Sequence, residues 1–296
     1  MSQRLRCSDA AQRRGDPRFA SAPLAQQWLL VEHPGPWGRH ILTDSGLEPG
    51  VAGALGRWAA QYGSRVVLIR RPGRELRTGQ PRRWAWVDSR PGREQLRWGT
   101  FDDEAELLDP LRDTALGTAS DEPIYLVCTH GKHDVCCALR GRPVAEALAA
   151  EHPQRTWECS HIGGDRFAAN LVLLPHGLYY GGVPAAQAGE LVRAYHDGRL
   201  SLPWLRGRCS LPAPVQAAQH FGRIATGENG VDAYSPLCCR PTGPDEWTVR
   251  LSAPNGQECV VVVRARMQAT EEPLTCAATR PGRFRVFELR NNPTAY

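Results

Sequence analysis

The chain has 296 residues, of which 42% are hydrophobic and 23% charged, and its formal net charge is +5. This is the composition of an ordinary globular protein with room for two or three small domains. No apolar run approaches the roughly 18–20 residues that span a bilayer, no signal-peptide pattern follows the basic N-terminus, and the basic residues form no stripe interleaved with aromatics. We therefore expect a cytoplasmic protein with neither a membrane nor a nucleic-acid partner.

The first part of the chain predicts alternating strands and helices. Residues 1–24 are polar and predict an N-terminal arm that is disordered or forms a loose cap. Beyond it the hydrophobic periodicity predicts the order strand, helix, strand, strand, strand, helix. The strands are expected at 26–33, 65–71, 82–90 and 94–100, and the helices around 51–62 and 102–111.

The same order of elements recurs further along the chain. Strands are predicted at 123–130, 155–161, 168–175 and 178–183, and helices at 143–152, with Pro143 in the first turn, and at 185–198. We interpret the recurrence as a degenerate internal duplication of residues 25–115 and 122–198. The first copy contains no cysteine, so only the second can hold a soft metal ion.

The C-terminal part has a different texture. Residues 202–215 are proline-rich and predict a linker, a short helix is expected at 215–227, and strands are expected at 247–253, 258–269 and 282–290. The sequence thus predicts an α/β protein in which two related α/β units are followed by a small β-rich domain at 210–296. No chemistry is evident in this last domain.

Ten cysteines in a cytoplasmic chain are not expected to form disulfides. There is no C-x-x-C pair, which argues against a zinc ribbon and against a thioredoxin-type dithiol. Isolated cysteines in such a chain are expected to be buried and to act as small hydrophobic residues. This interpretation applies to Cys7, Cys209, Cys259 and Cys276, and also to the adjacent pair Cys238 and Cys239.

The stretch CTHGKHDVCC, residues 128–137, holds three cysteines and two histidines. Cys128 ends a predicted buried strand, and Cys137 lies at the start of a helix, where free backbone N–H groups stabilise a thiolate. Cys136 is expected to point away from Cys137 and to be a neighbour of the site, not a ligand. His130 and His133 lie in the loop between the two cysteines. They are expected either to act outside the ligand set, as hydrogen-bond donors or as a docking surface, or to be ordinary solvated loop residues.

A second stretch, WECSHIGGDRF at residues 157–167, follows the next predicted strand. Strand alternation puts Cys159 and His161 on one face, and a right-handed strand–helix–strand crossover places the ends of the two parallel strands side by side. Four candidate metal ligands are therefore expected to converge: Cys128, Cys137, His161 and Asp165.

The blocks CTHGKHDVCC, GRPVA and ECSHIGGDRFAANLVLLPHGLYYGGV, with the earlier WLLVEHPGPWG, resemble the sucrase/ferredoxin-like family over roughly residues 22–200. The resemblance implies a thioredoxin-like ferredoxin domain with a [2Fe–2S] cluster, in which a C-x8-C pair holds one iron and an H-x3-H pair holds the other. Cys128 and Cys137 match the cysteine pair, and His161 matches the first histidine. Asp165 stands in place of the second histidine.

This departure leaves three assignments of the fourth ligand open. Asp165 ligates, Cys159 on the same strand face replaces it, or Asp165 orients an imidazole from outside. We favour Asp165, because Cys159 lies further back along the strand. A mixed ligand set tunes the reduction potential, and an imidazole ligand allows reduction to be coupled to protonation.

The sequence therefore predicts an electron-transfer protein with a redox partner protein whose identity it does not reveal. Two alternatives stay open: a thiol-dependent reductase or peroxidase that uses Cys137 as nucleophile, and a module that binds zinc. The pattern favours a carrier over an enzyme and gives no catalytic residues. No pair of carboxylates is arranged as the acid and base of a glycosidase, so we do not expect glycoside hydrolysis.

Overall fold

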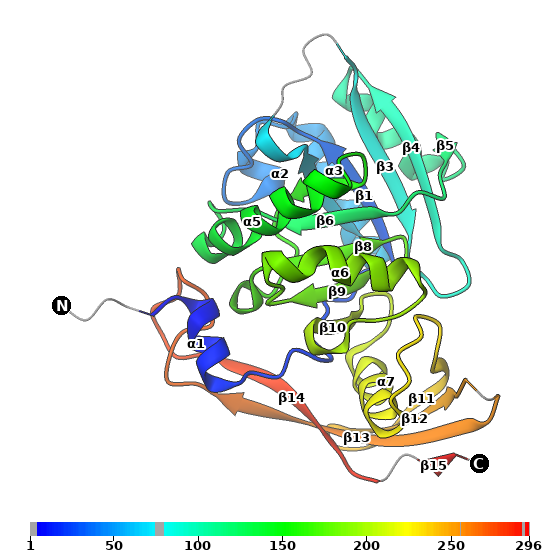
Figure 1. The fold of residues 1–296 in the computed structure, drawn as a ribbon. Helices are drawn as coiled ribbons and strands as arrows, with labels where there is room; N and C mark the ends of the chain where they lie inside the picture. The colour runs from blue at the N-terminus through cyan, green and yellow to red at the C-terminus, as the bar shows by residue number, and fades with distance from the viewer. Residues whose placement is uncertain (1–4, 75–79, 255, 292–293, 296) are drawn as a thin grey trace.

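The structure is a computed structural model that describes residues 5–74, 80–254, 256–291 and 294–295. Within these residues, ten strands form one mixed sheet in the order β10-β9-β8-β6-β7-β2-β1-β3-β4-β5, and five form a separate antiparallel sheet near the C-terminus (Figure 1). No helix in the described part of the chain is long and apolar enough to cross a membrane.

The first half of the large sheet is built by residues 27–119. β1 pairs in parallel with β2 and antiparallel with β3, and β3 pairs antiparallel with β4. The elements are β1 (Gln27–Glu32), α2 (Ile41–Asp44), α3 (Pro49–Tyr62), β2 (Arg65–Arg70), η1 (Pro72–Arg74), β3 (Arg82–Asp88), β4 (Gln95–Phe101), η2 (Glu104–Leu108), α4 (Asp109–Arg112) and β5 (Thr118–Ala119).

Helix α3 shows how the sequence specifies one of these elements. The Glu48 carboxylate accepts hydrogen bonds from the first free N–H groups, and Pro49 occupies the first turn, where its missing N–H costs nothing. Gly63, in the left-handed region, ends the helix. The buried Val51 and Leu55 pack with the sheet residues Leu29 and Leu68.

The second half repeats this topology. β6 pairs in parallel with β7 and antiparallel with β8, and β8 pairs antiparallel with β9. The elements are β6 (Ile124–Cys128), α5 (Val135–Glu151), β7 (Thr156–Cys159), η3 (Asp165–Phe167), β8 (Asn170–Leu174), β9 (Leu178–Gly181) and α6 (Ala185–His196). The predicted fold class, with a related cysteine-free unit before the cysteine-bearing one, is confirmed; the duplication and the domain boundaries stay predictions.

The two units join edge to edge. β2 pairs antiparallel with β7, with Ile69 opposite Cys159, and the sheet is continuous across this junction. One face of each unit is covered by its own helices, whereas the opposite faces share an apolar core. In that core Trp98 of the first unit stacks on Trp157 of the second, with ring centroids 5.6 Å apart.

Several segments differ from the sequence prediction, strand β11 (Ser235–Gly243) and the three that follow among them. Helix α5 begins at Val135 and not at 143, because the Asp134 carboxylate caps it, and Pro143 lies inside. The predicted linker contains η4 (Leu202–Trp204) and the edge strand β10 (Leu205–Arg208), which pairs with β9. The N-terminal arm contains helix α1 (Cys7–Arg14), which packs against η3.

The C-terminal domain packs helix α7 (Ala213–Thr226) on the small sheet, through Val215 and Ala218 of the helix and Val249 and Val261 of the strands. Its strands are β11 (Ser235–Gly243), β12 (Glu246–Ser252), β13 (Glu258–Ala269), β14 (Arg283–Leu289) and β15 (Thr294–Ala295). The loop between β13 and β14 reaches back towards α1 (Figure 1).

Candidate metal centre

The two motif loops meet at one end of the second unit. β6 and β7 are parallel, Cys128 is the register partner of Cys159, and the Thr129 N–H donates to the Cys159 carbonyl at 3.1 Å. Helix α5 comes close to this end because residue 141 is glycine: a Cβ there would lie 2.0 Å from the Cys128 carbonyl oxygen. The predicted crossover therefore brings both loops together.

The predicted ligand atoms converge at this point. Sγ of Cys128, Sγ of Cys137 and a ring nitrogen of His161 all lie within 4.8 Å of one another. Sγ of Cys137 is 3.8 Å from Nδ1 of His161 and 3.4 Å from Oδ1 of Asp165. Nδ1 of His161 lies 3.2 Å from the same carboxylate oxygen. Two thiols, an imidazole and a carboxylate therefore face one small volume.

The two candidates for the fourth ligand are placed differently. Asp165 contacts both Cys137 and His161. Cys159 is fully buried in the shared apolar core and joins none of the close groups of possible metal ligands found among the described residues. Burial raises the pKa of its thiol. The geometry thus favours Asp165 over Cys159, although ligation itself stays a prediction.

The Gly163-Gly164 turn is held by a buried polar network. Both glycines have positive φ, 94° and 87°. The Asn170 side-chain amide donates to the Gly164 carbonyl at 2.8 Å. Arg206, only 2% exposed, donates to the Gly163 carbonyl and to the Asn170 side-chain oxygen. Sequence reasoning missed Arg206, since it lies in the supposed linker.

The electrostatics of the group favour a bound cation. A hydrogen bond from Cys137 lowers the pKa of the buried Cys128 thiol, and the same pairing raises the pKa of Cys137. Burial raises the pKa of Asp165. Three acidic groups cannot all ionise in so small a buried volume without a compensating positive charge. Thiolate and imidazole are the donors that iron–sulfur clusters and Zn²⁺ accept, so the residues present fit either.

The histidines of the Cys128–Cys137 loop have different surroundings. Nε2 of His130 faces the Gly38 carbonyl at 2.8 Å, and its Nδ1 accepts from the His161 N–H at 3.1 Å, so both ring nitrogens are engaged by backbone. The ring of His133 stacks on that of His161 with centroids 3.7 Å apart, and a nitrogen of it lies near His161 and Asp165. Sequence reasoning left His133 undecided; its position makes it a further possible donor.

Two positively charged residues belong to the motif stretches themselves, Lys132 and Arg166. Lys132 is exposed in the loop. Arg166 follows Asp165 but pairs with Asp16 at 3.3 Å and lies over the rings of Phe167 and Phe284. Arg166 therefore links the N-terminal segment and the C-terminal domain to the second unit.

Comparison with known protein families matches residues 19–207 to the sucrase/ferredoxin-like family. The chain belongs to this family. Sucrase/ferredoxin-like sequence thus covers both α/β units and ends at β10, and it leaves out helix α7 and the small sheet. Among curated proteins none gives a significant match.

One solved structure that resembles this sucrase/ferredoxin-like chain is a cysteine-to-serine variant of the thioredoxin-like [2Fe-2S] ferredoxin from Aquifex aeolicus. The two are 19% identical, and the match covers 29% of this chain and 99% of that one with a TM-score of 0.26.

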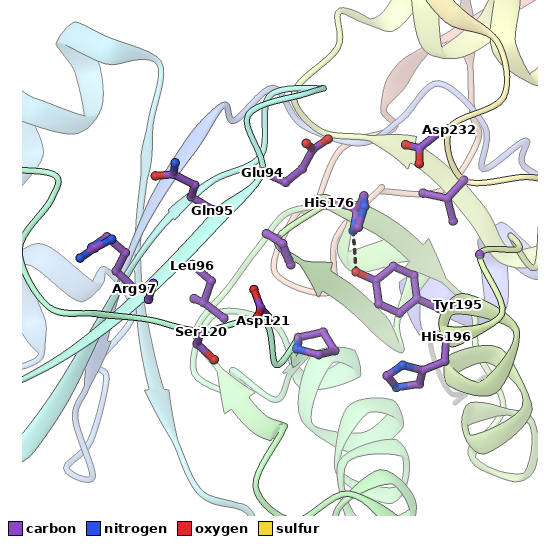
Figure 2. A pocket seen from close by; sticks show the side chains of 15 residues that line it. Glu94, Gln95, Leu96, Arg97, Ser120, Asp121, His176, Tyr195, His196 and Asp232 are labelled. Carbon is purple, nitrogen blue, oxygen red and sulfur yellow. Dashed lines mark hydrogen bonds between the residues drawn. The ribbon is translucent and has the colours of Figure 1, made fainter.

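A cleft of about 520 Å³ lies at the other end of β6. Figure 2 shows His176 hydrogen-bonded to the Tyr195 hydroxyl, with Glu94 and Asp232 on its rim. Arg208 pairs with both carboxylates, and Asp121 also lines the cleft. The cleft contains none of the predicted ligands.

A second cluster of cysteines was not expected. Sγ atoms of Cys7, Cys136 and Cys276 lie with a carboxylate oxygen of Asp134 within 4.8 Å of one another. Cys7 is buried as predicted but is not isolated, and Cys276 is neither isolated nor fully buried. Cys136 and Cys276 are 140 positions apart, and no local pattern in the sequence indicates that their segments dock together.

Proposed function

We propose that this protein is an electron carrier whose [2Fe–2S] cluster is held by Cys128, Cys137, His161 and Asp165. The observation that carries the proposal is that the strand–helix–strand crossover brings the Cys128 and Cys137 thiols and the His161 ring within 4.8 Å of one another, with Asp165 in contact with His161. These residues stand at the positions where the family resemblance implies a cysteine pair and an imidazole pair.

The bound cluster would accept and return a single electron. The chain supplies a dry and fixed environment for it: Cys128 and Cys137 are 1% and 0% exposed, and His161 has a side chain that is 17% exposed. A neutral imidazole in place of thiolate leaves less negative charge on a cluster and raises its reduction potential, whereas the Asp165 carboxylate returns one negative charge and lowers it. The redox partner protein stays unidentified.

The first experiment is the spectrum and metal content of freshly purified protein. A red-brown sample with about two irons and two sulfides per chain supports the proposal. Comparing Asp165→Ala with Cys159→Ala then identifies the fourth ligand: loss or a marked shift of the cluster's electron paramagnetic resonance signal is expected only for Asp165→Ala. A colourless, iron-free wild type prepared without oxygen would refute the proposal.

A single zinc ion is a second candidate, because the donor atoms lie close together. With Zn–S bonds of about 2.3 Å, sulfurs in a tetrahedral site are about 3.8 Å apart. The separations of 3.2, 3.4 and 3.8 Å among Cys137, His161 and Asp165 suit one ion directly. In a [2Fe–2S] cluster the cysteine pair and the other pair bind different irons and would have to move apart. A colourless protein that loses zinc in Cys128→Ser would favour this alternative.

The thiol-enzyme alternative has less support. A nucleophilic cysteine needs a lowered pKa and access to substrate. Cys137 is fully buried, and its partner Cys128 raises its pKa. Peroxide or disulfide consumption by metal-free protein would be needed to revive this function.

A further inference from the structure

The second cysteine cluster lies at the start of helix α5, on a different side of the helix from the candidate metal centre. Cys7 opens helix α1, Cys136 is the second residue of α5, and Cys276 lies in the loop between β13 and β14. Sγ of Cys276 is 3.4 Å from Sγ of Cys136 and 3.5 Å from Sγ of Cys7. Three separate parts of the chain thus contribute one sulfur each to the same point.

We propose that Cys7, Cys136, Cys276 and Asp134 bind one Zn²⁺ ion. This would be a structural site that fastens the N-terminal helix and the C-terminal domain to the second α/β unit. It shares no ligand with the proposed [2Fe–2S] site and stands whether or not that proposal holds.

The sulfur separations distinguish an ion site from a disulfide. A disulfide bond is about 2.05 Å long and joins two cysteines, which would leave the third thiol over. The separations of 3.4 and 3.5 Å are longer than that bond and near the edge of about 3.8 Å expected for thiolates on one tetrahedral zinc. All ten cysteines of the chain are free.

Asp134 is positioned to complete the site. Its Oδ1 accepts from the Cys136 N–H at 2.9 Å and its Oδ2 from the Cys276 N–H at 2.7 Å, which fixes the backbone of two ligands. The same two oxygens lie 3.8 and 3.7 Å from Sγ of Cys7. Each oxygen has a second lone pair, so the carboxylate can orient the thiolates and still bind the ion.

Burial and charge support a bound cation here as well. Cys7 and Cys136 are 3% and 0% exposed, beside the apolar Ala168. The nearby guanidinium of Arg166 already pairs with Asp16. A divalent ion would displace the thiol protons and neutralise the thiolates and the carboxylate together.

The test is the metal content of full-length protein produced in zinc-supplemented medium. We expect Cys7→Ser and Cys276→Ser each to contain about one zinc per chain less than the wild type, whichever metal the Cys128 site holds. Cys259→Ser, which removes a buried cysteine of the small sheet far from the cluster, should keep its zinc. Iron and visible absorption, measured in the same samples, should be unchanged in all three variants, which separates this site from the proposed carrier function.

A cobalt measurement guards against a variant that misfolds. Wild-type protein produced with Co²⁺ in place of zinc should show the sulfur-to-cobalt charge-transfer absorption of a tetrahedral thiolate site. Cys276→Ser alters only a partly exposed loop and should lose that absorption while its far-ultraviolet circular dichroism is kept. Wild type without zinc, zinc content unaffected by both substitutions, or a disulfide within the cluster in unreduced protein would overturn the proposal.

Discussion

The adjacent thiols of Cys136 and Cys137 face two different groups. Sγ of Cys137 lies 3.8 Å from Nδ1 of His161, whereas Sγ of Cys136 lies 3.4 Å from Sγ of Cys276. Successive residues of a helix point about 100° apart, and the first turn of α5 uses this to serve both clusters. The Asp134 carboxylate caps the helix by accepting from the Cys136 N–H at 2.9 Å.

Substitution at these two neighbouring positions should therefore have separate effects. We expect Cys137→Ser to lose the visible absorption and most of the iron, and Cys136→Ser to keep at least about four fifths of both, because only Cys137 faces the proposed cluster ligands. Iron, sulfide and the electron paramagnetic resonance spectrum measure this. Equal iron loss in both variants would show that the candidate metal centre depends on the cluster of Cys7, Cys136 and Cys276.

Gly141 allows the close approach of helix α5 to strand β6 at the candidate centre. A Cβ there would lie 2.0 Å from the Cys128 carbonyl oxygen, so Gly141→Ala must push α5 away from β6. We expect unfolding to be easier by about 2–4 kcal/mol and iron content to fall at least twofold. Urea unfolding and iron analysis measure both effects.

The matched control is Gly53→Ala in helix α3. There the nearest atom to an added Cβ is the end of the Arg57 side chain at 3.4 Å, so the higher helix propensity of alanine should stabilise the protein by up to about 1 kcal/mol. Destabilisation of similar size at both glycines would contradict the explanation by close approach.

The candidate centre could be predicted from sequence because local rules define it. Alternation along β7, the glycine turn and the right-handed crossover suffice to bring His161 to Cys128. The cluster of Cys7, Cys136 and Cys276 could not be predicted, because it depends on how α1 and a distant hairpin loop dock, which leaves no periodic signal. Likewise, Pro143 indicates a helix start, but the cap at Asp134 and the burial of the turn that follows it decide where α5 begins.

Gly164→Ala should disturb the turn that carries Asp165. The residue has φ 87°, and an added Cβ would lie 2.5 Å from the Arg206 guanidinium. Gly92→Ala is the matched control, since Gly92 has φ 74° and open space around it. We expect a loss of about 1 kcal/mol for Gly92→Ala from the backbone conformation, and at least about 2 kcal/mol more for Gly164→Ala from the clash in a buried network. Equal losses by urea unfolding would contradict this.

His220 should make stability depend on pH. Its ring stacks on Phe19 with centroids 4.0 Å apart, and burial lowers its pKa from 6.5 to about 4. The unfolded chain therefore binds a proton near pH 6.5 that the folded protein refuses until about pH 4, so stability falls as the pH drops through this range. Between pH 7 and 4.5 the free energy of unfolding should therefore fall by about 1–3 kcal/mol less in His220→Phe than in the wild type. The control is His40→Gln at an exposed position, which should leave the fall unchanged. Urea unfolding at pH 7 and 4.5 measures it.

The reduction potential should fall as the pH rises if His161 is an iron ligand. Nδ1 of this ring faces Cys137 and Asp165, which leaves Nε2 to exchange a proton, and a side chain 17% exposed gives solvent access to it. Reduction puts negative charge on the iron and favours a proton on the ring, so the potential should drop by up to about 59 mV per pH unit for one electron and one proton. Protein-film voltammetry from about pH 6 to 9 measures this. His161→Cys should give a lower and flatter potential, because a thiolate ligand adds negative charge and carries no titrating proton. A flat wild-type potential would count against ligation by His161.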